Sequence, residues 1–109
     1  MNYISIDEFK KIDIRIGKIL EVKDHPNANK LYVLIVDLGN EKRQIVAGIK
    51  DWYKPEELLG KKIVVITNLE PKNIRGMESQ GMLLAAEDEN KNLSLIVPEK
   101  DVKVGTKVY

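Results

Sequence analysis

The amino-acid sequence predicts an all-β domain, a five-stranded barrel with two short helices and a C-terminal strand extension. Short apolar runs of strand length recur along the chain, and the first of them alternates apolar with polar residues as a half-buried strand does. Gly, Asn and Pro separate these runs, as expected for turns between strands. At 109 residues the chain is long enough to close one core, so we expect a single domain.

The predicted elements follow one another in a simple order. A capping box formed by Ser5 and Glu8 predicts a short N-terminal helix. Isoleucine alternates with polar residues from Ile12 onward, which indicates a long first strand with a bulge or bend at Gly17. Pro55, followed by two glutamates, predicts a helical turn between the third and fourth strands. The five expected strands cover residues 12–22, 31–38, 44–49, 62–68 and 81–86.

This order of three strands, a helical turn and two strands is the plan of the OB-fold, a five-stranded barrel that binds oligonucleotides or oligosaccharides. The first strand is long enough to pair with two partners. The core barrel is expected to cover about residues 12–86, where the fifth strand ends. The whole chain, residues 1–109, is then one OB-fold domain with short N-terminal and inter-strand helices.

Apolar residues continue past the predicted barrel, in the C-terminal extension of residues 87–109. They alternate with turn residues, which predicts two further short strands. Each Leu or Val left in water would forgo about 1.5–3 kcal/mol. We therefore expect part of the extension, with the N-terminal helix, to form a two-fold dimer contact. The alternative is that the extension plugs an open end of the barrel.

Composition argues against several classes of function. Charge is dense but balanced, with 18 Lys and Arg against 17 Asp and Glu, so binding of nucleic acid through bulk charge alone is not expected. The chain has no Cys and one His, so we expect no metal site and assign His25 to a turn. No nucleophile–base set or glycine-rich phosphate loop is present, which predicts no catalytic residue and no cofactor. Without a signal peptide or a membrane-length apolar run, a cytoplasmic protein with no membrane partner is expected.

The polar segment 68–81, between the fourth and fifth predicted strands, carries most candidate binding residues. It offers Asn, Lys, Arg, Ser and Gln side chains, which donate hydrogen bonds to phosphates or base edges. Loops held between rigid strands are frequent binding sites. Lys72 and Arg75 are the strongest candidates, because Pro71 stiffens the loop and Gly76 lets the backbone approach a partner.

Three further candidates lie at strand ends. Lys30 and Arg43 precede or begin the second and third strands, and Met82 would pack on a base or ribose face if it is exposed. Among six aromatic residues, only Tyr32 lies on a strand that forms the groove, which disfavours a general single-strand binder that stacks bases. A binder of folded RNA, which reads shape, sugar hydroxyls and phosphates, stays open.

Taken together, several segments resemble the tRNA-binding domain family. This family includes a free-standing dimeric tRNA-binding protein and the C-terminal domain of bacterial methionyl-tRNA synthetase. The short chain is similar to a stand-alone member, such as the separate beta subunit of an archaeal-type methionyl-tRNA synthetase. The matching segments are residues 13–19, 25–31, 36–39, 43–49 and 68–86.

The resemblance implies a non-catalytic OB-fold homodimer that binds tRNA through its structure and acts in trans with the methionyl-tRNA synthetase catalytic chain. The barrel face is expected to display its polar side chains outward, toward the tRNA. Two alternatives use the same fold: a dimeric secretion-type chaperone for unfolded peptides, and a dimerisation module with a vestigial tRNA site. The tRNA-binding residues implied are Lys30, Arg43, Asn68, Lys72, Arg75, Ser79, Gln80 and Met82.

Overall fold

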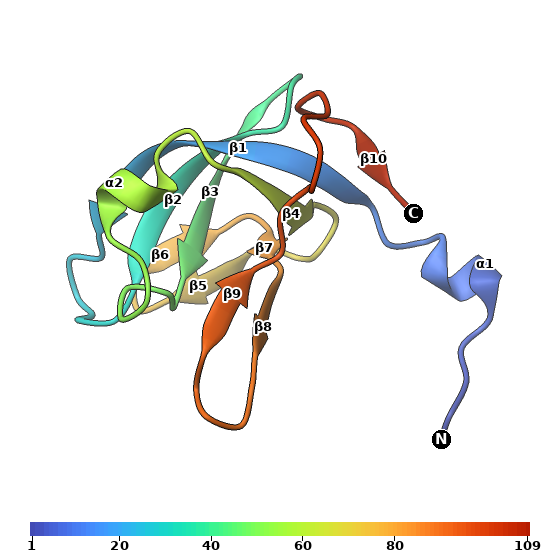
Figure 1. The fold of residues 1–109 in the computed structure, drawn as a ribbon, viewed down its shortest axis with the longest axis horizontal. Coiled ribbons are helices and arrows are strands. Elements are labelled where there is room, and N and C mark those ends of the chain that lie inside the picture. The colour runs from blue at the N-terminus through green and yellow to red at the C-terminus, as the bar shows by residue number, and fades with distance from the viewer.

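The computed structural model describes residues 1–109 and contains a nearly closed, antiparallel five-stranded barrel (Figure 1). The strand order is β3-β2-β1-β4-β7, so the predicted all-β, OB-like barrel is confirmed. Backbone hydrogen bonds link neighbouring strands along this path, and the edges at β3 and β7 approach each other. The barrel strands are β1 (Ile14–Asp24), β2 (Tyr32–Asp37), β3 (Lys42–Ala47), β4 (Lys62–Ile66) and β7 (Met82–Leu83).

The long strand β1 allows the barrel to close because it pairs with two neighbours. Its first residues pair with β4 and its later ones with β2, and the partner changes at Lys18. The register shift lies between Ile19 and Glu21, so the bulge predicted at Gly17 is displaced along the strand. Gly17 is required for another reason: a Cβ there would lie 2.6 Å from Cγ1 of buried Val36. The neighbouring strand therefore packs directly on the backbone of β1.

Both predicted helices are present as single turns. In α1 (Ile6–Phe9), the Glu8 amide donates to the Ser5 hydroxyl at 3.0 Å, which confirms the capping box. Nothing in α1 is fully buried. In α2 (Pro55–Leu58), the last residue is completely buried and seats the helix on the barrel. No helix of the structure is long and apolar enough to span a membrane.

The C-terminal extension contributes to the main core. Leu95 is buried there, and its amide donates to the Tyr53 hydroxyl at 3.0 Å. The core therefore reaches beyond residue 86, where we expected the barrel to be complete. The two short strands predicted in the extension are confirmed as β9 (Leu93–Leu95) and β10 (Lys107–Val108), the latter paired with the start of β1.

The predicted fifth strand is divided in the structure. After β7, Leu84 donates to Val64 and accepts from Ile96, which transfers the chain from one sheet to another. The following strand, β8 (Ala85–Glu87), pairs with β9 in a hairpin that projects from the barrel (Figure 1). The segment 68–81, expected to be a loop, also contains a hairpin, formed by β5 (Lys72–Ile74) and β6 (Met77–Ser79).

Candidate functional site

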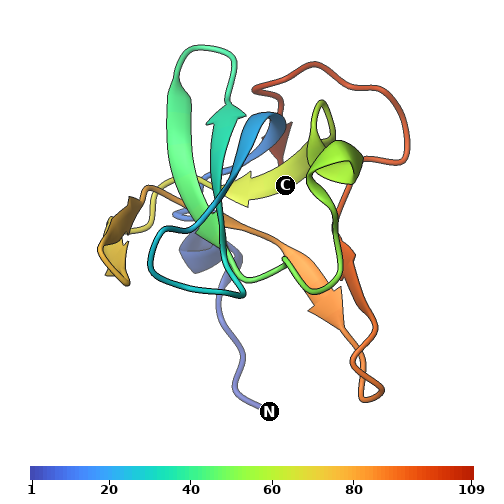
Figure 2. The ribbon, with the colours of Figure 1, turned by 90° about the vertical axis from the view of Figure 1, so that its left-hand side faces the viewer.

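The β5–β6 hairpin holds Arg75 at its tip. The two-residue turn consists of Arg75 and Gly76, whose φ angles of +56° and +96° are of the kind that tight hairpin turns require. Gly76 adopts such an angle without strain, whereas for an arginine it is uncommon. Figure 2 shows this hairpin on the side of the barrel opposite α2. The turn therefore holds one cation, Arg75, at a defined position. The sequence predicted a polar binding loop here from its composition, and did not predict the hairpin.

A second loop, between β1 and β2, fixes the hairpin in place. The buried His25 ring accepts from the Asn27 amide at 2.9 Å through Nδ1 and donates from Nε2 to the Ile74 carbonyl at 2.9 Å. These partners require a proton on Nε2 and none on Nδ1. Asn27 also donates from Nδ2 to the Arg75 carbonyl at 3.3 Å, and the Arg75 guanidinium donates to the Asn27 carbonyl at 3.1 Å. The predicted turn role of His25 is confirmed, whereas sequence reasoning missed Asn27, whose only signal was its place in the turn.

Ser79 does not face solvent, which contradicts its expected outward display. Only 5 % of its surface is exposed. Its hydroxyl accepts from the Val46 amide at 3.0 Å and donates to the Gly81 carbonyl at 3.1 Å. A buried hydroxyl with both partners satisfied has no donor left for a ligand. Ser79 therefore serves to join β6 to the edge of β3.

Gln80 also joins the two edges of the barrel. Its backbone amide donates to the backbone carbonyl of Gln44 at 2.7 Å, and its side-chain Oε1 accepts from the backbone amide of Gln44 at 3.0 Å. The remaining Nε2 donates to Glu78 at 3.0 Å. The side chain thus imitates a backbone group and extends the pairing between β3 and the chain before β7. The expected display toward a ligand is not found for this side chain.

Arg43 is half-buried and bound to the barrel. Its Nη1 donates to the carbonyls of Thr67 and Gln80, at 2.6 Å and 3.0 Å, while its Nε contacts Glu41. These contacts tie β3 to the chain segments that follow β4 and precede β7. The guanidinium predicted as a phosphate contact is therefore engaged within the protein.

Asn68 belongs to a clamp between the start of β1 and the end of β4. Its Oδ1 accepts from the Asp13 amide at 2.8 Å, and its Nδ2 donates to the Lys11 carbonyl at 2.6 Å. Arg15 donates to the Asp13 carboxylate at 2.9 Å and the Thr67 hydroxyl also donates to it, which together lower the pKa of Asp13. Although Asn68 lies at the surface, both polar atoms of its side chain are already bonded.

The remaining predicted residues are accessible. Lys72 and Met82 both border a cavity of about 240 Å³ beside the hairpin, and Met82 leaves 46 % of its surface exposed. Lys30 is exposed before β2, where its Nζ lies 3.7 Å from Asp51. The structure thus brings Lys72, Arg75 and Met82 to one hairpin and its border, and leaves Lys30 outside the residues that line the cavity. The cavity is lined by Val46, Leu69, Glu70, Lys72, Ile74, Ser79, Gly81 and Met82.

Comparison with known proteins identifies the family of this chain. Residues 14–107 match the family model described as a putative tRNA binding domain. The chain belongs to this family. Over 99 % of its length it is 61 % identical to a methionine–tRNA ligase of Thermococcus kodakarensis and 63 % identical to one of Pyrococcus furiosus. It spans only 14 % and 15 % of those two proteins.

Solved structures agree with the family at the level of the fold. A MetRS-related protein from Pyrococcus horikoshii superposes with a TM-score of 0.93 at 44 % identity, and each chain is covered completely. A CsaA chaperone from Picrophilus torridus superposes with a TM-score of 0.89 at 34 % identity, covering 98 % of this chain and all of the other. The tRNA-binding domain fold is therefore shared with a protein described as a chaperone.

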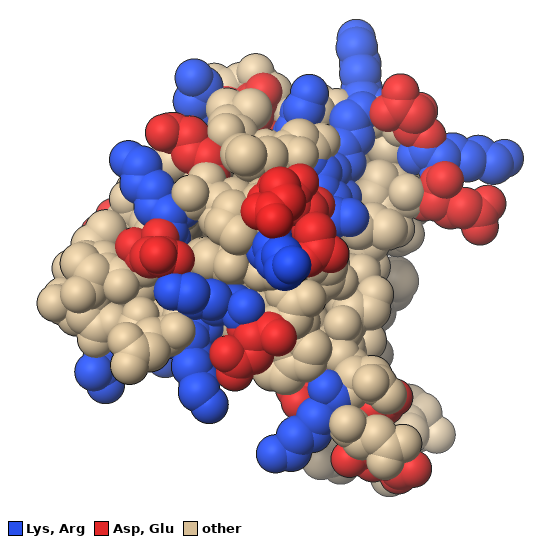
Figure 3. Space-filling view, turned by 60° about the vertical axis from the view of Figure 1, so that its left-hand side comes forward, with Lys and Arg blue, Asp and Glu red and all other residues tan.

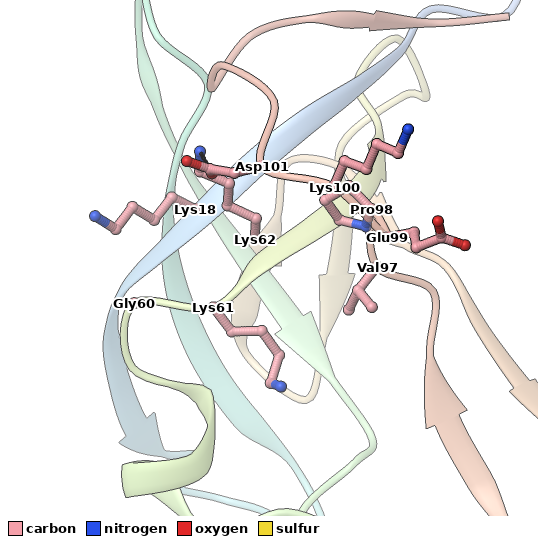
Figure 4. Close-up of a pocket in the computed structure, with 9 residues that line it drawn as sticks. All are labelled: Lys18, Gly60, Lys61, Lys62, Val97, Pro98, Glu99, Lys100 and Asp101. Carbon is pink, nitrogen blue, oxygen red and sulfur yellow. Dashed lines mark hydrogen bonds and ion pairs between the residues drawn. The ribbon is translucent and has the colours of Figure 1, made fainter.

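The largest cavity of this tRNA-binding domain lies elsewhere, between the end of α2 and residues 97–101 (Figure 4). It measures about 570 Å³ and is lined by four lysines and two acids. Lys62 donates to Asp101 and to the Val102 carbonyl, each at 2.6 Å, whereas Lys18, Lys61 and Lys100 point in different directions (Figure 4). The free ammonium groups do not converge on one ligand position.

Charges of both signs are interspersed on the visible face of Figure 3. No large area of one sign appears there, in agreement with the net charge of +1. A broad electrostatic footprint is therefore not the feature that marks a nucleic-acid site on this face. The β5–β6 hairpin and its cavity are the best-defined candidate site.

Proposed function

We propose that this chain is a non-catalytic module that binds tRNA through the β5–β6 hairpin. The observation that carries the proposal is the fixed presentation of Arg75 at the hairpin tip, with Lys72 at the edge of the neighbouring cavity. Neutralising phosphates with Lys and Arg releases counterions from nucleic acid, and a positioned pair of cations orients the bound backbone. Membership of a family of putative tRNA-binding domains supports tRNA as the ligand.

We further propose that the module acts with a methionyl-tRNA synthetase catalytic chain. Several relatives with more than half of their aligned residues identical are methionine–tRNA ligases, of which this chain spans about one seventh. A module of this kind supplies tRNA affinity and leaves aminoacylation to the catalytic domain. Adding the chain to a synthetase catalytic chain in a methionylation assay should lower the KM for tRNA and leave the KM for methionine unchanged. An unchanged KM for tRNA would contradict the partnership with the synthetase and would leave the proposed tRNA binding standing.

We also propose a homodimer formed by the two ends of the chain. Tyr3, Ile4 and Ile6 are largely exposed around α1, and a separate cavity of about 310 Å³ is lined by residues of the two ends of the chain, among them Phe9 and Val108. Exposed apolar surface of this extent often marks a site of protein–protein contact. A two-fold contact in which the N-terminal segment of one protomer covers the cavity of its partner would bury these side chains.

A chaperone for unfolded polypeptides is the second candidate function, favoured by the likeness to CsaA and by the apolar side chains in the 240 Å³ cavity. A competition assay distinguishes the two. Labelled tRNA bound to the protein should be displaced by unlabelled tRNA and not by a denatured polypeptide at the same concentration. Displacement of the labelled tRNA by the denatured polypeptide, and not by unlabelled tRNA, would favour the chaperone function.

A further inference from the structure

We infer that the cavity beside the β5–β6 hairpin binds one unpaired nucleobase of the tRNA, an inference that rests on the proposed function. Contacts to a duplex backbone would use cations and hydrogen-bond donors only. The structure shows a different surface at this position. Apolar side chains lie next to a cation there, and the predicted donor Ser79 is bonded inside the protein.

The polar side chains predicted to bind a ligand in this region are bonded within the chain. The Ser79 hydroxyl is bonded to Val46 and Gly81, and the side chains of Gln80 and Asn68 are bonded within the chain. The Ser79 hydroxyl therefore has no free donor with which to bind a sugar–phosphate backbone, and the side chains of Gln80 and Asn68 do not line the cavity. The lining side chains left to contact a ligand in the cavity are therefore the apolar ones and the charged Lys72 and Glu70.

Two exposed apolar side chains border the cavity from different elements. Leu69 follows β4 and Met82 begins β7, and each leaves 46 % of its surface in water. Ile74 of the hairpin lines the same cavity and is half-buried. A paired base hides its faces in the helix stack, whereas an unpaired base offers a flat apolar face to such side chains. Methionine is well suited to this contact because its thioether is polarisable and adaptable.

The charges at the rim favour a nucleotide over an apolar peptide side chain. Lys72 and Glu70 both line the cavity, and neither takes part in an ion pair of the structure. The Lys72 ammonium matches the phosphate of the bound nucleotide. The Glu70 carboxylate can only accept hydrogen bonds, so it matches an N–H group on the base edge, which is free in an unpaired base.

The first test measures tRNA affinity of the full chain after the apolar rim is made polar. The double variant Leu69→Ser/Met82→Ser should bind tRNA about five- to tenfold more weakly, at the lower end of the effect of removing a stacking side chain. Leu59→Ser is the matched control, because Leu59 is 54 % exposed and follows α2, on the opposite side of the barrel (Figure 2). The control should bind like the unchanged protein. Equal affinity of the double variant and the control would overturn the inference.

The second test uses the unchanged protein and does not depend on the folding of a variant. Dimethyl sulfate and a carbodiimide report the base edges of bound tRNA, and hydroxyl radicals report its backbone. We expect one or two unpaired bases to become protected, next to a protected stretch of backbone. Backbone protection with no protected unpaired base would reject the base site and keep the proposed tRNA binding. The absence of any protection at low salt would reject both.

A polypeptide ligand for the cavity would also be revealed. If a fluorescent denatured polypeptide binds the unchanged protein and loses affinity in Leu69→Ser/Met82→Ser, while tRNA affinity is equal in both, the cavity serves polypeptides. That result would overturn the base site.

Discussion

At the scale of single residues, polar side chains of the same segment either face solvent or form hydrogen bonds within the fold, and only the structure distinguishes the two groups. Sequence composition correctly placed Lys72 and Arg75 at the surface of a polar segment. It also placed Ser79 there, although that hydroxyl lies inside. The reason is physical: Ser79 satisfies an amide of β3, a strand more than 30 positions earlier in the chain. The residues around Ser79 in the sequence do not indicate a hydrogen-bond partner so far away in the chain.

Ser79→Ala tests this division of roles. The substitution leaves the Val46 amide buried without a partner, so the free energy of unfolding should fall by about 1–3 kcal/mol. The tRNA affinity of the folded variant should stay within twofold of the unchanged protein. Denaturant unfolding and filter binding at a temperature where the variant is folded measure the two quantities. A large loss of affinity at unchanged stability would instead make Ser79 a ligand contact.

At the scale of elements, local patterns predicted the strands of the barrel and missed what depends on distant contacts. The predicted strands agree with the observed ones to within a few residues, because each is a local apolar run bounded by turn residues. The β5–β6 hairpin was missed because its cross-strand pairs are few and its position depends on His25 and Asn27 of another loop. The predicted fifth strand was divided because Leu84 pairs with partners on both sides, from β4 and from the extension.

The clamp around Asp13 has a consequence for pH dependence. Hydrogen bonds from Arg15 and Thr67 lower the pKa of Asp13 in the folded state. A lowered pKa means that the ionised carboxylate stabilises the fold above the ordinary value of 3.8 and that this contribution disappears as pH falls through the folded pKa. Asp13→Asn should therefore lower the free energy of unfolding by about 1–2 kcal/mol at pH 7.

The difference between Asp13→Asn and the unchanged protein should begin to shrink as the pH falls below about 4, where the carboxylate of the unfolded chain becomes protonated, and should disappear below the lowered pKa of the folded state. Urea unfolding at pH 7, 5 and 3 follows the difference directly. Glu78→Gln serves as a control, because Glu78 is exposed and contacts only Gln80 through its carboxylate. A constant difference at all three pH values would show that the charge of Asp13 has no role in the clamp.

At the scale of the whole molecule, the ends of the chain and the hairpin define two separate surfaces. Ile4 and Ile6 are 64 % and 66 % exposed, in the segment proposed as the dimer contact. Ile4→Glu/Ile6→Glu should convert a dimer to a monomer in sedimentation equilibrium, because charges would be buried without partners. Leu59→Glu, on another surface, should leave the mass unchanged. A monomeric unchanged protein at micromolar concentration would contradict the proposed dimer.

The salt dependence of tRNA binding tests the central claim most directly. The slope of log affinity against log salt counts the phosphates that the protein neutralises, at about 0.9 per phosphate for a duplex. Lys72→Ala/Arg75→Ala should weaken binding of every tRNA species and reduce the slope by about 1–2. Lys100→Ala removes a cation that lines the other cavity, the one drawn in Figure 4, and not the hairpin cavity, so it should change neither quantity. A slope and an affinity equal to those of the unchanged protein in the double variant would contradict tRNA binding through this hairpin.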